Sequence, residues 1–255
     1  MILRSVIDHV KAQHWTAVFL DFVIVVLGVF IGIQVSNWNA ERGERAKEYG
    51  YLVSLNEDIL RSITTIDRTI GLLRRESDSQ KVFLDALAQC KAPPGARDKI
   101  EFAISTLGYI NAPIFSSRTY DELTSSGSFD IIENEDIKTG LADIVRRVAH
   151  LNQTVENVYR LTEHHRFTVE ENILFTEIKP YDEFGSAASV EYDIAKLCKN
   201  HKVASAVSAI RLQTVDRLNS FQALSDLYRT LPPLIEQEIS NRWGRDIEDE
   251  ENTSS

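Results

Sequence analysis

Cysteine is scarce in this sequence, and its scarcity excludes several classes of small site. The 255 residues contain two cysteines, Cys90 and Cys198, which lie far apart. Neither belongs to a CxxC motif or to a cluster of cysteine and histidine, so zinc-ribbon, c-type haem and thioredoxin-like proteins are excluded. The two cysteines can form at most one disulfide bridge.

Motifs of catalysis and cofactor binding are also missing. The chain has no G-x-G-x-x-G fingerprint, no phosphate-loop lysine motif and no G-x-S-x-G elbow. His164 and His165 have no histidine or acidic residue three or four positions away, which is the spacing that a helix-borne metal site needs. We therefore expect no enzyme activity, no cofactor and no metal.

Positive charge is in deficit. Lysine and arginine number 28 against 38 aspartate and glutamate residues, which gives a formal net charge of -10. A surface that follows nucleic-acid phosphates would have to be a local exception to this field. We therefore expect no nucleic-acid partner.

One long apolar run stands out against this background. WTAVFLDFVIVVLGVFIGIQV begins at Trp15 and has one ionisable side chain, and about 20 apolar residues suffice to cross about 30 Å of hydrocarbon as a helix. Trp15 and Trp38 bracket the run at positions suited to the two membrane interfaces. The pattern predicts a transmembrane helix over 15–36, with the lipid bilayer as its partner.

Two other interpretations of the run are disfavoured. A cleaved signal peptide would have a shorter apolar region followed by a small-x-small site, whereas SNWNAER follows here. A buried helix of a soluble protein would carry its apolar residues as one stripe, whereas here they run all round the helix.

A small and polar stripe marks the same run. Gly28 and Gly32 form a GxxxG pair, and at 100° per residue Asp21 and Ser36 fall near them on the helix circumference. Small residues let two helices approach closely, and such a contact would shelter Asp21 from lipid. The stripe predicts a homodimer through the transmembrane helix. The alternatives are contact with an unrelated helix, or no contact and an Asp21 that is protonated or reached by water.

The segment after the run is amphipathic. Leu52, Ile59, Ile66 and Leu73 recur at seven-residue steps, with charged opposite faces. The pattern predicts that the membrane helix continues outward until Pro93 stops it. A coiled coil and an intramolecular bundle both fit this stripe. The bundle is favoured because polar residues interrupt a strict coiled-coil seam; these are Asn56, Ser62 and Thr69.

Further helices are predicted at 97–107, 135–175 and 203–230, with a last short helix ending near Trp243. Asn134 suits the N-cap of the second of these, and Gly127 suits a helix stop before it. No alternating strand pairs are found. The predicted fold is all-α: a single N-terminal transmembrane helix followed by a bundle of about three long helices plus short ones.

This pattern predicts four regions: a short flank at 1–14, the transmembrane helix at 15–36, one helical extramembrane domain at 37–245 and a disordered acidic tail at 246–255. Basic residues do not orient the span, because their numbers on its two sides nearly tie. They are Arg4 and Lys11 before it, and Arg42, Arg45 and Lys47 after it.

Two segments resemble an uncharacterised family of bacterial single-pass membrane proteins. The first is DFVIVVLGVFIGIQVSNWNAER, with an apolar run that contains glycine and a W-N-x-x-R motif beside the membrane. The second is TYDELTSSGSFDIIENEDIK, where a Y-D-E-L-x-x-x-G pattern is matched by Tyr120, Glu122, Leu123, Gly127 and Ile132. The resemblance implies the bacterial inner membrane, a cytoplasmic N-terminus and a periplasmic domain, and it carries no activity.

In an oxidising compartment, Cys90 and Cys198 could form one bridge. The simplest up-and-down path of three helices places the two cysteines at opposite ends of the bundle, beyond bridging distance. The bridge therefore requires the chain after Pro180 to run back along the bundle, and both outcomes stay open.

Two classes of function fit the sequence. The first is a protein-interaction or structural module of the bacterial envelope, bound to an unidentified envelope protein. The alternative is a ligand-sensing domain. Its N-terminal stretch of about 14 residues is too short for an effector domain, so such a sensor would act through a separate partner subunit.

Overall fold

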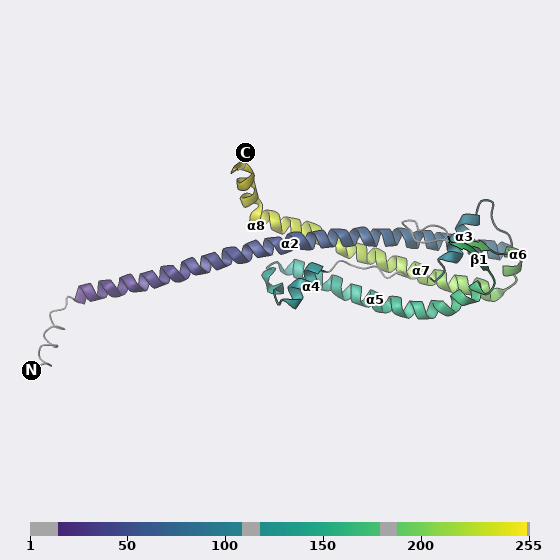
Figure 1. Ribbon diagram of the computed structural model, residues 1–255, viewed down its shortest axis with the longest axis horizontal. Coiled ribbons are helices and arrows are strands. Elements are labelled where there is room, and N and C mark those ends of the chain that lie inside the picture. Colours follow the sequence, from purple (N-terminus) through teal and green to yellow (C-terminus); the bar gives the residue numbers. More distant parts are fainter. Residues whose placement is uncertain (1–14, 109–117, 179–187, 254–255) are drawn as a thin grey trace, which may run out of the picture. The chain divides into compact units, whose positions relative to one another are not determined.

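Helix α2 of the computed structural model spans Trp15–Gln89, a length of 75 residues (Figure 1). It runs as one helix because the apolar run passes, without a proline, into the amphipathic stripe that begins at Leu52. The prediction that the helix continues past the apolar run and stops before Pro93 is confirmed.

The chain divides into two units, Met1–Tyr51 and Leu52–Ser255. The predicted flank at 1–14 and the chain around Pro180 lie outside the described residues. The structure describes residues 15–108, 118–178 and 188–253, with side chains for all of these except 15–18, 21, 178 and 245–253.

The second unit is mostly helical. Its three longest segments are the later part of α2, α5 and α7, and short elements join them. The bounds after α2 are α3 (Arg97–Ser105), α4 (Arg118–Ser125), the 3-10 helix η1 (Phe129–Ile131), α5 (Glu135–Glu170), β1 (Leu174–Ile178), β2 (Ala188–Glu191), α6 (Ile194–Leu197), α7 (His201–Tyr228) and α8 (Leu231–Thr253).

Helix α2 ends in a turn around Cys90. The N–H of Lys91 donates to the carbonyl of Ala86 at 3.1 Å, and the N–H of Cys90 donates to that of Leu87 at 3.4 Å. These two bonds form a Schellman motif, in which the residue after the helix adopts the left-handed conformation. Cys90 has φ of 49°, a region that glycine usually occupies.

Two predicted helix boundaries are confirmed. Gly127, with φ of 70°, follows α4, and the N–H of Ser128 closes the turn on the carbonyl of Leu123 at 2.9 Å. Asn134 caps α5, because its side-chain oxygen accepts bonds from N–H groups of the first turn, including that of Ile137 at 3.2 Å.

The expectation of no strand pairs is wrong. Helix α5 ends at Glu170 instead of continuing to Phe175, and β1 then pairs antiparallel with β2. Ala188 and Val190 of β2 are buried, and β2 packs on α3. The described side chains of β1 are all exposed. Strand β1 therefore lacks the buried face whose alternating pattern reveals a strand in a sequence.

Helix α8 is longer than predicted. It begins at Leu231, with Pro232 and Pro233 in its first turn, where the missing N–H of proline is tolerated. It continues to Thr253, so most of the tail predicted to be disordered, 246–255, is helical here. The acidic residues of this segment include glutamate, a good helix former, and no proline follows Pro233.

Helices α2 and α7 run antiparallel. The hydroxyl of Ser225 donates to Asp67 at 3.1 Å, and Arg217 pairs with Glu76 at 3.5 Å, so contacts move backward along α7 as they move forward along α2. Helix α5 packs against α7 and, near its start, against α8.

The direction of α5 differs from the simplest up-and-down path. Near its start, Gly140 faces Leu231, whereas Val169, near its end, shares a hydrophobic cluster with Phe83 of α2 and Val203 of α7. Helix α5 is therefore parallel to α2, and α7 begins at the end of the bundle where α2 stops (Figure 1). The up-and-down path assumed for the cysteines is wrong.

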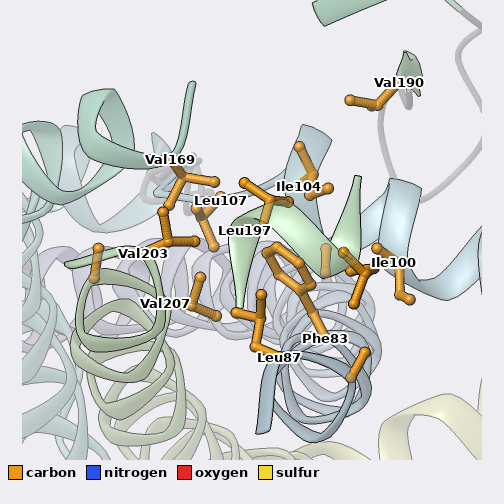
Figure 2. Packing of buried hydrophobic residues seen from close by; sticks show 14 of the residues in the cluster. Phe83, Leu87, Ile100, Ile104, Leu107, Val169, Val190, Leu197, Val203 and Val207 are labelled. Atoms are coloured by element: carbon orange, nitrogen blue, oxygen red, sulfur yellow. The ribbon is translucent and has the colours of Figure 1, made fainter. Parts of the chain in front are cut away.

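Buried apolar residues gather at both ends of this bundle. We call the group around Phe83, Ile100 and Leu197 the disulfide-side core; in Figure 2 their side chains converge from α2, α3 and α6. The α4-side core is the second group. It includes Leu52, Leu55, Ile66, Leu123, Ile132, Ile137, Phe221, Leu224 and Leu231.

Candidate functional site

The predicted association stripe lies on the first part of α2. Gly28, Gly32 and Ser36 recur every four residues along a continuous helix, so they share one face. A Cβ added at either glycine would meet no atom within 4 Å, and Ser36 is exposed. Asp21 lies in the same helix, but its side chain is outside the described residues.

The apolar side chains around this stripe are exposed as well. Phe19, Phe22, Val29 and Ile31 are representative, with more than half of each side chain exposed. By length and composition, one helix in the described part of the chain is able to cross a membrane, and it is this part of α2.

The structure brings Cys90 and Cys198 together as a disulfide. The two Sγ atoms lie 2.08 Å apart and the Cα atoms 5.2 Å apart. Cys90 follows the last turn of α2, and Cys198 caps the C-terminus of α6. The bridge forms at this end because Leu87 and Leu197, close to the two cysteines in sequence, are buried in the disulfide-side core.

A buried polar layer, which was not predicted from the sequence, lies between the two cores. We define it as Glu76 and Gln80 of α2 with Arg217 of α7. Along α2 it falls between Leu73 and Phe83, and along α7 between Ile210 and Phe221, all of which are buried. These three polar side chains therefore lie where apolar residues are expected.

The electrostatics of the polar layer are unfavourable to charge. Glu76 and Arg217 pair at 3.5 Å, at the long end of hydrogen bonding. Burial raises the pKa of Glu76 from 4.5 to about 7, and the charge of Arg217 opposes that rise. Burial also lowers the pKa of Arg217, against the effect of Glu76. Desolvation thus outweighs the attraction within the pair.

Several polar atoms of the layer have no hydrogen-bond partner in the described structure. They are Oε1 and Nε2 of Gln80, whose exposed fraction is 0%, and Nε of Arg217. A buried polar atom without a partner costs about 1–3 kcal/mol. The neighbouring Arg211 is satisfied, since its Nε donates to the carbonyl of Ser77 at 3.2 Å.

Spacing was the signal that could have revealed the polar layer. Leu73, Glu76, Gln80 and Phe83 follow one another at steps of three, four and three residues. The buried stripe of a helix has this spacing. Within the all-polar stretch RRESDSQK, however, the two polar positions look like part of an exposed face.

Apolar side chains are exposed on α5 and β1 as well. Tyr159, Leu161 and Phe167 project from α5, and Leu174 and Phe175 project from β1, with exposed fractions from 42% to 64%. We call these five residues the exposed α5 and β1 residues. They do not form one continuous patch, because Tyr159 and Leu161 lie on different faces of α5 and Leu174 and Phe175 on opposite faces of β1. Exposed aromatic residues such as Phe167 and Phe175 are nevertheless of a type enriched in protein interfaces.

Among the residues described, no three or more histidine, cysteine, aspartate or glutamate side chains are grouped so as to hold a metal ion. His164 and His165 lie side by side on α5, with ring centroids 5.9 Å apart.

No protein-family model matches this chain, and no curated protein or solved structure matches it either.

Proposed function

We propose that this chain is a membrane-anchored interaction module of the bacterial envelope, in which α2 crosses the inner membrane once and three long helices in the second unit form a bundle in the periplasm. The observation that carries the proposal is the presence, in one chain, of an exposed apolar helix and a disulfide-bonded helical unit. The helix supports anchoring. The disulfide supports an oxidising compartment, because cytosolic thiols are kept reduced.

The exposed α5 and β1 residues support a protein partner for the bundle. Leu161 is 64% exposed and Leu174 60% exposed. Burying either side chain in an interface would be favourable by roughly 25 cal/mol per Å² of apolar surface. Aromatic residues such as Phe167 and Phe175 are enriched in the cores of protein interfaces. We therefore assign the contact with an envelope protein to these exposed residues.

The anchor supports a second contact, between two copies of the chain. The open space around Gly28 and Gly32 would let a second helix approach closely at these positions. A homodimer through the membrane would also shelter the two Asp21 side chains from lipid. In this arrangement two bundles are tethered together, which raises the effective concentration of their binding surfaces.

Site-specific crosslinking in cells tests the proposed function. A photoreactive amino acid placed at Phe167 or Phe175 of the full chain should capture one protein in stoichiometric yield. The matched control is Glu156, an exposed polar position on α5, which should capture little. No discrete product from either aromatic position, or the same products from Glu156, would contradict the assignment.

Topology is tested separately. A reporter enzyme that is active only outside the cytoplasm should be active when it is fused after Ser255. An inactive reporter at this position, together with activity of a second reporter that works only in the cytoplasm, would contradict the proposed orientation.

A further inference from the structure

The bundle is divided by its polar layer. The disulfide-side core and the α4-side core each consist of tightly buried apolar residues, whereas Glu76, Gln80 and Arg217 separate them on both α2 and α7. The polar layer, whose buried polar atoms lack hydrogen-bond partners, is therefore expected to be the least stable part of the bundle. Local opening takes place where the burial of groups contributes least to stability.

Opening at the layer would relieve three separate costs. Gln80 would gain partners for both atoms of its amide in water, and Nε of Arg217 would gain one as well. Glu76 and Arg217, now at 3.5 Å, would each recover hydration. Elsewhere along α2, opening would expose residues such as Ile66 and Phe83, each with an exposed fraction of 0%, and would be opposed by the hydrophobic effect.

We propose that the polar layer is a joint, at which the bundle opens locally between its two cores, and that a proton on Glu76 controls how often it opens. The closed joint holds Glu76 out of water and favours its neutral form. The open joint hydrates Glu76 and favours its carboxylate. Loss of the proton therefore drives opening.

The charges that act on Glu76 are few. On its own helix, Asp78 is exposed. On α7, the charge of Arg217 acts on Glu76, while Arg211 is bonded to the carbonyl of Ser77. Helix α5, which packs on α7, fully buries only residues that do not ionise. His165 and Arg166 are half-buried on it, and Arg166 pairs with Glu170 at 3.2 Å. Asp58 is another buried carboxylate on α2, but it lies 18 residues before Glu76, which is about 27 Å along the helix.

The direction of the pH effect follows from linkage. Glu76 binds its proton more tightly in the closed bundle, where its pKa is about 7, than in water, where the ordinary value is 4.5. The open state therefore gains on the closed state as the pH rises from 4.5 through 7. Between pH 6 and pH 8 the ratio of open to closed forms should rise roughly tenfold.

Hydrogen exchange of the full chain in lipid nanodiscs measures this ratio. Peptides that cover 74–82 and 212–219 should be protected less than peptides from either core. After correction for the intrinsic exchange rate, their protection should fall roughly tenfold from pH 6 to pH 8. Two results with the unmodified protein would each overturn the proposal. One is uniform protection along α2, and the other is protection at the layer that does not change with pH.

Two variants identify the group responsible. Glu76→Gln keeps the shape of the side chain and removes its proton equilibrium, so protection at the layer should no longer depend on pH. Asp78→Asn is the matched control two residues away on the exposed face, and it should keep the full dependence. A dependence that survives in Glu76→Gln, or disappears in Asp78→Asn, would overturn the role of Glu76.

Discussion

Thr119 donates both its backbone N–H and its hydroxyl to Oδ2 of Asp58, at 3.0 and 2.7 Å. Asp58 is buried on α2, and Thr119 is the second residue of α4. The carboxylate therefore satisfies an N–H group at the start of α4 and places negative charge at the positive end of its helix dipole. Arg61 binds the other oxygen of Asp58. One side chain thus fixes the start of α4 against α2.

Replacing the carboxylate of Asp58 should destabilise the folded protein. We expect Asp58→Ala to lower the free energy of unfolding by about 2–3 kcal/mol, because both donors of Thr119 lose their acceptor in a buried place. Glu57→Ala is the control, since Glu57 is 62% exposed and meets Arg61 at 3.5 Å; it should cost less than about 1 kcal/mol. Urea unfolding in detergent, followed by circular dichroism, compares the two. Equal losses would contradict the capping role.

A close approach of α5 and α8 gives the second prediction. A Cβ at Gly140 would lie 2.5 Å from Cδ2 of Leu231, whose exposed fraction is 0%. We expect Gly140→Ala to be destabilising, because overpacking costs about 1–3 kcal/mol and the gain in helix propensity is at most about 1 kcal/mol.

The control for this contact is Gly50→Ala. A Cβ at Gly50, in α2, would meet nothing within 4 Å, so this variant should be neutral or more stable. Thermal unfolding of both variants under the same conditions separates steric contact from helix propensity. A melting temperature that rises in both would show that Leu231 yields without cost.

The third prediction concerns the disulfide. Denatured, unreduced protein should show no free thiol, because Cys90 and Cys198 are bridged. Reduction, or the double change Cys90→Ser and Cys198→Ser, should lower the free energy of unfolding by up to about 4.7 kcal/mol, as expected for a loop of this length. Thiol labelling of unreduced protein checks the bridge directly, and two labels per chain would rule it out.

The fourth prediction concerns the anchor. Replacing Gly28 and Gly32 with leucine should abolish association of the isolated apolar helix in a membrane two-hybrid assay, because bulk on this face prevents close approach. Replacing Val26 and Phe30, on the opposite face, with leucine should leave association intact. Both variants should remain in the membrane fraction to the same extent after washing with alkaline carbonate. Association that persists without the glycines would contradict the homodimer.

The sequence was sufficient to predict helix boundaries that depend on one residue and its near neighbours in the chain. Asn134 caps α5 with its own side chain, and Gly127 closes α4 in the conformation that glycine favours. The continuity of α2 was predictable for the same reason, since the apolar run and the stripe after it contain no proline and Pro93 follows the helix.

Features that depend on distant partners were not predictable in this way. The burial of Glu76 is decided by α7, which lies more than a hundred residues later, and the pairing of β1 is decided by β2. The direction of α5 depends on how the chain passes from α3 to α4, because α3 belongs to the disulfide-side core whereas Thr119 lies beside Asp58. The pattern of apolar residues within α5 does not indicate whether this helix runs parallel or antiparallel to α2.

The separation of 108 residues between the bridged cysteines has a consequence for biosynthesis. If the second unit crosses a membrane as it is synthesised, in the order of its sequence, Cys90 emerges long before Cys198. At roughly 5–20 residues per second, the wait between them is about 5–20 s. During that interval Cys90 would be an unpaired thiol, and the proposed homodimer would hold two such thiols in the same neighbourhood. Correct pairing therefore depends on an oxidation that comes late enough for Cys198 to arrive.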